Sequence, residues 1–84
     1  MNSELRSERT SRLLVAQLET VALAAHSLGT HHEEVVRLLE SVSLAASHAV
    51  DLQLLREDQA TAIWADAHAR HPELPAALEL VHAA

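Results

Sequence analysis

The chain has no cysteine, lysine, phenylalanine or tyrosine, and its 84 residues include one glycine and two prolines. Without cysteine there can be no disulfide, no thiolate metal site and no thiol nucleophile. So few turn-forming and aromatic residues argue against a sheet protein, which needs frequent turns and β-favouring side chains. The sequence therefore predicts an all-α protein with a single helical-bundle domain over residues 1–84.

Positive charge is also scarce, since six arginines face twelve acidic residues and give a net charge of −6. Trp64 is the only aromatic residue, so the chain lacks both the basic patch and the stacking platform that nucleic acids require. No uncharged stretch approaches the roughly 20 apolar residues of a membrane span. We expect neither a nucleic-acid nor a membrane partner, and a cytoplasmic location. Arginine without lysine, together with abundant alanine, favours a bacterial origin.

Two long helices, over about 3–28 and 31–54, are predicted from apolar residues that recur in alternating steps of four and three. Gly29 suits the end of the first helix, and Thr30 and Glu33 have the capping-box spacing that opens a second. So short a connection predicts a long antiparallel helical hairpin. The periodic positions are Leu14, Leu18, Val21, Ala25 and Leu28 in the first helix, and Val35, Leu39, Val42, Ala46 and Ala49 in the second.

A third helix over about 57–70 and a short fourth helix over about 75–83 follow in the prediction. The third begins with Glu57 and Asp58, acids that suit a helix N-terminus, and ends before Pro72. Pro75 suits the first position of the last helix. No glycine or proline marks the break between the second and third helices, so its position is open within a few residues. We expect Trp64, the only large side chain, to anchor the third helix in the core or else to meet a partner.

The apolar faces of the two long helices are wider than one hairpin can cover. A chain of this length is also marginally stable without further apolar burial. We therefore expect a homodimer that completes a helical bundle, or a different protein partner covering the same face. The flanking residues that widen the face are Leu13, Val15, Ala22, Leu38, Ala45 and Leu52, and the predicted interface residues are Leu14, Leu18, Val21, Val35, Leu39, Val42 and Trp64.

Seven histidines suggest metal binding, because neutral imidazole is a common ligand of transition metals. His68 and His71 lie three residues apart on the third predicted helix, and Glu79 and His82 have the Glu-x-x-His spacing of di-iron bundles. These four residues are the predicted ligands of a divalent metal. No other cofactor is expected.

The sequence favours a small non-catalytic protein–protein interaction module, such as an adaptor, regulator or accessory subunit, that acts as a helical homodimer. The first alternative is a divalent-metal-binding bundle with histidine and carboxylate ligands. The second is a small helical enzyme acting on an organic substrate. No catalytic residue is predicted, because the sequence has no recognisable nucleophile and base pair and no phosphate-cradling glycine loop.

Overall fold

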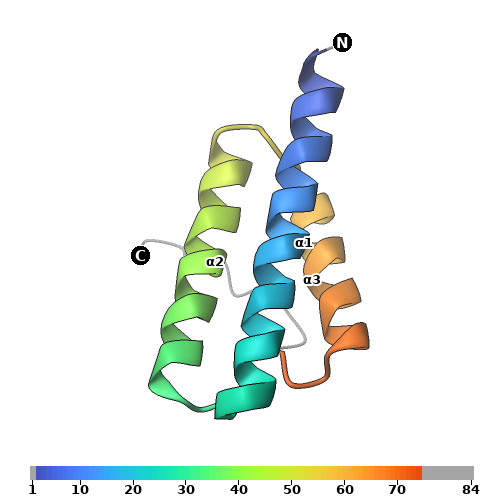
Figure 1. Ribbon diagram of the computed structural model, residues 1–84. Coiled ribbons are helices and arrows are strands. Elements are labelled where there is room, and N and C mark those ends of the chain that lie inside the picture. Colours follow the sequence, from blue (N-terminus) through green and yellow to red (C-terminus); the bar gives the residue numbers. More distant parts are fainter. Residues whose placement is uncertain (1, 75–84) are drawn as a thin grey trace.

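The computed structural model describes residues 2–74, with side chains from residue 5 onward. This part of the chain consists of three α-helices and contains no strand: α1 (Asn2–Leu28), α2 (Glu33–Asp51) and α3 (Glu57–Arg70). The all-α prediction and the helical hairpin are confirmed, because α2 folds back along α1 (Figure 1). The predicted fourth helix lies outside the described residues.

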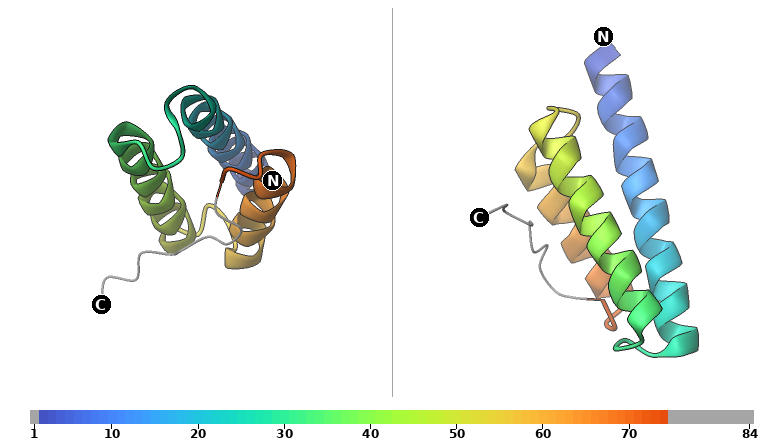
Figure 2. Two further views of the ribbon diagram at one scale, coloured as in Figure 1. Left: turned by 90° about the horizontal axis from the view of Figure 1, so that it is seen from below. Right: turned by 90° about the vertical axis from the view of Figure 1, so that its left-hand side faces the viewer.

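Helix α1 lies between the other two helices and packs against both, whereas α2 and α3 contact each other less (Figure 2). Helix α3 turns back after α2 and runs in the same direction as α1. The face formed by α1 and α2 on the side away from α3 is therefore left uncovered by any described part of the chain.

Gly29 ends α1 as predicted, with a φ of +99° that a glycine adopts without steric cost. Its N–H donates to the carbonyl of Ala25 at 2.9 Å, which completes an αL cap. The predicted capping box of Thr30 and Glu33 does not form. Instead His32 is the N-cap of α2, and its Nδ1 accepts a hydrogen bond from the N–H of Glu34 at 3.1 Å. Helix α2 consequently begins at Glu33, two residues later than predicted.

Helix α2 ends at Asp51, three residues earlier than predicted, in a Schellman motif. The N–H of Leu54 donates to Ala49 at 2.8 Å, and the N–H of Gln53 donates to Val50 at 3.0 Å. Gln53 occupies the left-handed position of this motif with a φ of +62°, a position where glycine is usual. The helix thus stops without the glycine or proline that would reveal the stop in a sequence.

The bounds of α3 agree with the prediction. The side-chain Oε1 of Gln59 accepts a hydrogen bond from the backbone N–H of Arg56 at 2.9 Å, and the acids Glu57 and Asp58 lie in the first turn. Both features favour a helix start at this point. The hydrogen bond satisfies a free backbone N–H, and the two carboxylates interact favourably with the positive end of the helix dipole.

Trp64 is the largest buried side chain and is only 1% exposed, so it belongs to the core as expected. It lies in one apolar cluster with Leu18 and Val21 of α1. Small side chains let the helix backbones approach closely around it. The buried alanines are Ala22, Ala25, Ala46, Ala49, Ala60 and Ala67.

The left-handed conformation of Gln53 predicts that Gln53→Gly stabilises the protein by about 0.5–1 kcal/mol, because glycine removes the steric cost of this conformation. The measurement is the free energy of unfolding in urea. Gly29→Ala is the matched control, and it should lower the free energy of unfolding by about 1 kcal/mol. A Cβ at position 29 meets no atom within 4 Å, so this destabilisation would come from the strained backbone conformation alone. A destabilised Gln53→Gly variant would contradict the Schellman geometry.

Candidate functional site

The seven side chains predicted to meet a second copy lie inside the single chain. Helix α3 completes a core around them, so a second copy cannot reach most of them while the bundle is folded. Leu39 is half-buried. The other six are 5% exposed or less: Leu14, Leu18, Val21, Val35, Val42 and Trp64.

An exposed apolar surface lies beside this core. Leu13 on α1 is 66% exposed and Leu52 at the end of α2 is 69% exposed, and each borders a groove of about 370 Å³ between the two helices. Leu38 continues the stripe, since Leu38, Ala45 and Leu52 recur every seven residues along α2 and its C-cap. The residues lining the groove are Thr10, Leu13, Leu14 and Gln17 of α1, Ala45, Ala46, His48 and Ala49 of α2, and Leu52, Leu54 and Leu55 after it.

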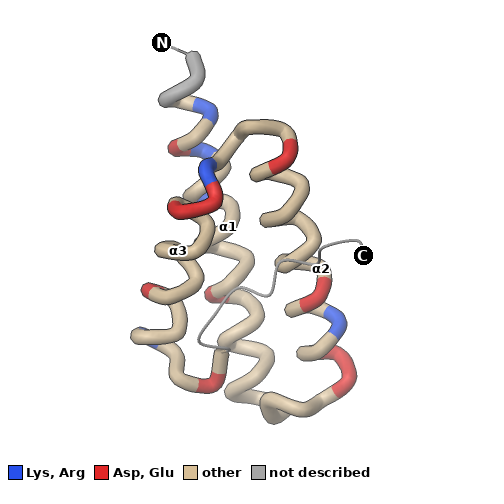
Figure 3. The backbone as a smooth tube through the Cα atoms, turned by 180° about the vertical axis from the view of Figure 1, so that it is seen from behind, with Lys and Arg blue, Asp and Glu red and all other residues tan. Residues whose placement is uncertain are grey.

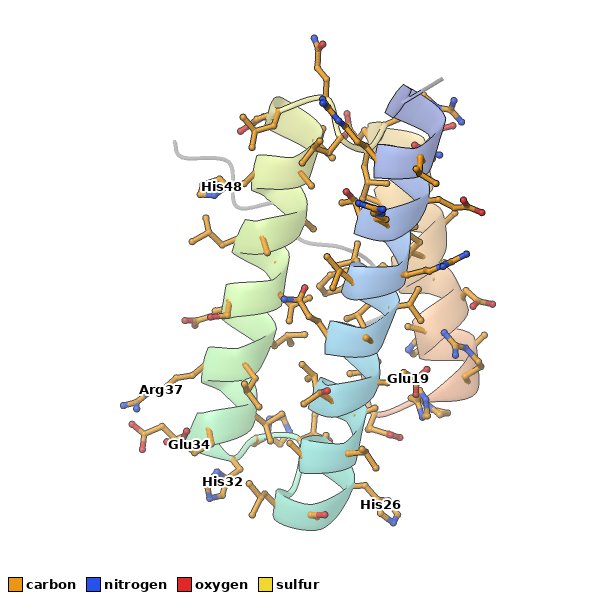
Figure 4. The ribbon with its side chains drawn as sticks, turned by 45° about the horizontal axis from the view of Figure 1, so that its top comes forward. Glu19, His26, His32, Glu34, Arg37 and His48 are labelled. Carbon is orange, nitrogen blue, oxygen red and sulfur yellow. The ribbon has the colours of Figure 1, made fainter. Side chains whose placement is uncertain are left out.

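No aspartate, glutamate or arginine lines this groove. We call the surface made by its lining residues and Leu38 the α1–α2 face. His48 is its only titratable residue, and its ring is exposed and points away from α1 (Figure 4). The face is therefore apolar and neutral on a chain whose net charge is −6.

A cluster of charged side chains fastens the end of α3 to α1. The two carboxylate oxygens of Glu19 accept hydrogen bonds from Arg70 Nη1 at 2.5 Å and from His71 Nε2 at 2.7 Å. Arg70 also pairs with Asp66 at 3.2 Å, one turn earlier on α3. Glu19 is labelled in Figure 4, where it lies on the α3 side of α1.

The segment that follows α3 is held by a second histidine. His68 Nδ1 lies 2.6 Å from the carbonyl oxygen of Leu74, and Leu74 is buried. Since a carbonyl only accepts, Nδ1 of His68 carries the proton. Together with Glu19 and Arg70, this contact fixes the end of the bundle opposite to the start of α3.

Of the four predicted metal ligands, His68 and His71 each engage protein atoms, while Glu79 and His82 lie outside the described residues. A metal at His71 would have to displace the Glu19 carboxylate from Nε2 or use Nδ1, which lies 3.8 Å from Glu73. Within residues 2–74 no three histidine, aspartate or glutamate side chains are close enough to hold one ion. The metal site remains a prediction.

A second, more open hollow of about 730 Å³ separates the first half of α1 from the connection between α2 and α3. Its lining mixes Glu8, Arg56 and Glu57 with serine, glutamine and leucine. Arg56 donates a hydrogen bond to Asp58 at 3.1 Å and holds the pKa of that carboxyl below its ordinary value. The lining brings together no histidine and no acid–base pair of the kind that catalysis needs.

The Glu19, Arg70 and His71 cluster was not found from the sequence. Glu19 is recognisable only as an acid off the apolar stripe, and its partners are 51 and 52 residues away. The exposed residues Leu13, Leu38, Ala45 and Leu52, by contrast, are among those predicted to widen the apolar face.

Comparison with protein-family models, with curated proteins and with solved structures finds no match to this chain. No helix in the described range is both long and apolar enough to cross a membrane.

The contacts of Glu19 predict that Glu19→Gln lowers the free energy of unfolding by about 0.5–1.5 kcal/mol, because the neutral amide loses its charge-assisted bond to Arg70. Urea unfolding at low and high salt is the measurement, and the loss should shrink as salt rises. Glu40→Gln is the control, since Glu40 is exposed and forms no ion pair with any residue from 5 to 74. Equal effects of the two substitutions would contradict a role for the cluster in holding α3.

Proposed function

We propose that this protein is a non-catalytic protein–protein interaction module that pairs with a second copy of itself through the α1–α2 face. The observation that carries the proposal is the exposure of Leu13 and Leu52 beside a groove that contains no charged residue. Large apolar side chains exposed singly are ordinary, but a continuous apolar face commonly marks an interaction site.

The electrostatics of the chain favour this face for self-association. Two copies each carry a net charge of −6 and repel each other over most of their surfaces. In a two-fold symmetric contact, a charged residue near the axis meets the same charge on its partner. A neutral face such as this one avoids that repulsion.

The size of the face also suits a dimer of moderate affinity. Helix α2 has 19 residues, so it is about 28 Å long, and two packed helices are about 19 Å wide. Each copy would cover about 530 Å², or roughly 1,100 Å² in total, which lies at the lower end of specific interfaces. Burying Leu13, Leu38 and Leu52 there would add apolar burial to a small domain.

The test introduces a charge into the apolar groove of the face. We expect the protein to dimerise in the micromolar range and Leu13→Glu to raise the dissociation constant at least about ten-fold, because association would bury an unpaired carboxylate in an apolar contact. Sedimentation velocity over a concentration series measures this constant, and circular dichroism checks that the variant is folded.

The control is Ala62→Glu, which adds the same charge to an exposed position of α3, away from the face. It should leave the dissociation constant within about two-fold of the original. A protein that stays monomeric up to roughly 100 µM, or a Leu13→Glu variant that dimerises unchanged, would overturn the proposal.

A further inference from the structure

The two ends of the α1–α2 face carry charges of opposite sign. Arg6 and Arg9 precede Leu13 at seven and four residues, which places them in the same stripe of α1. Glu34 precedes Leu38 by four residues in the stripe of α2. All three charged residues are exposed, and the groove between them contains no charge.

The antiparallel hairpin separates these charges along the long direction of the face. The N-terminal part of α1 and the N-terminal turn of α2 lie at opposite ends of the molecule (Figure 1), so Arg6 and Arg9 lie at one end of the face and Glu34 at the other. Figure 3 shows the molecule from behind, where acidic and basic residues occur at both ends. A two-fold axis can relate two such faces in two ways. The copies either lie the same way up, with like ends together, or are inverted, with each arginine end over a glutamate end.

We propose that the partner on the α1–α2 face is an inverted second copy, with α1 packed across α1 and α2 across α2 of the partner. This inference rests on the proposed self-association and specifies its geometry. In the inverted arrangement Arg6 and Arg9 of one copy approach Glu34 of the other, and the symmetry repeats the attraction at the other end. The arrangement with like ends together places four arginine side chains near one another.

Neighbouring charges limit the size of this attraction. Glu34 lies 3.5 Å from Arg37 of its own chain, which also pairs with Glu33 at 2.8 Å. Glu8 lies 3.8 Å from Arg12, on the part of α1 that borders the second hollow rather than the α1–α2 face. Arg9 forms no ion pair with any residue from 5 to 74, so its charge is available to a partner.

The first experiment measures the dissociation constant of Arg9→Gln by sedimentation velocity at low and high salt. We expect an increase of about two- to ten-fold at low salt, because two exposed ion pairs are lost per dimer, and a smaller increase at high salt. Arg12→Gln is the matched control, since it removes the same charge from an arginine already paired with Glu8. A lower dissociation constant for Arg9→Gln would contradict the inverted arrangement, because it would mean that the original dimer places like charges close together.

Reversing the two charges, singly and together, gives a further test of the inverted arrangement. Arg9→Glu and Glu34→Arg should each weaken the dimer, and the double variant should restore it towards the original constant. In the arrangement with like ends together, both single variants leave like charges in contact and the double variant gives no rescue. Absence of rescue would therefore count against the inversion.

The second experiment uses cross-linking, for which a chain without cysteine is well suited. With a short bis-maleimide, Thr10→Cys should not cross-link to itself, because the two positions lie at opposite ends of an inverted dimer. A mixture of Thr10→Cys and Leu28→Cys, one at each end of the paired part of α1, should cross-link. Efficient self-linking of Thr10→Cys would overturn the inversion while leaving the dimer intact, whereas a monomer by sedimentation would overturn both proposals.

Discussion

The rest of the structure depends on the burial of Trp64 where α3 meets the hairpin. The other core side chains are leucine, valine and alanine, so this indole supplies the largest buried surface in the described bundle. It joins α3 to the cluster formed by Leu18 and Val21 of α1. The small side chains around it let the helices approach closely.

Helix α3 also determines which part of the apolar stripes remains exposed. It covers the side of α1 that carries Leu18, and its last turn is fixed to Glu19 through Arg70 and His71. The opposite side of the hairpin, with Leu13 and Leu52, stays open. The same helix thus completes the core and defines the surface available to a partner.

The sequence predicted those features that have a local chemical signature. Gly29 marked the end of α1, and Glu57 and Pro72 marked the limits of α3. Helix α2 begins two residues later and ends three residues earlier than predicted, because His32 caps through a ring nitrogen and Gln53 adopts a conformation usual for glycine. Periodicity located the apolar stripe of each helix but not the direction from which α3 would cover it. For that reason Leu14 and Val35 were predicted at an interface although they are core residues, and the partners of Glu19 were missed.

The first buried side chain of α1 is Leu14, although the helix begins at Asn2. Its N-terminal end projects past the connection between α2 and α3 (Figure 1). The turns from residue 5 to residue 13 bury no side chain fully and carry local contacts such as Thr10 to Arg6 and Arg12 to Glu8. An isolated helix of this length is marginal in water, so the free energy of opening here is far below that of the core. Amide hydrogens of these turns should exchange quickly in a lone chain, and their protection would report contact with another molecule.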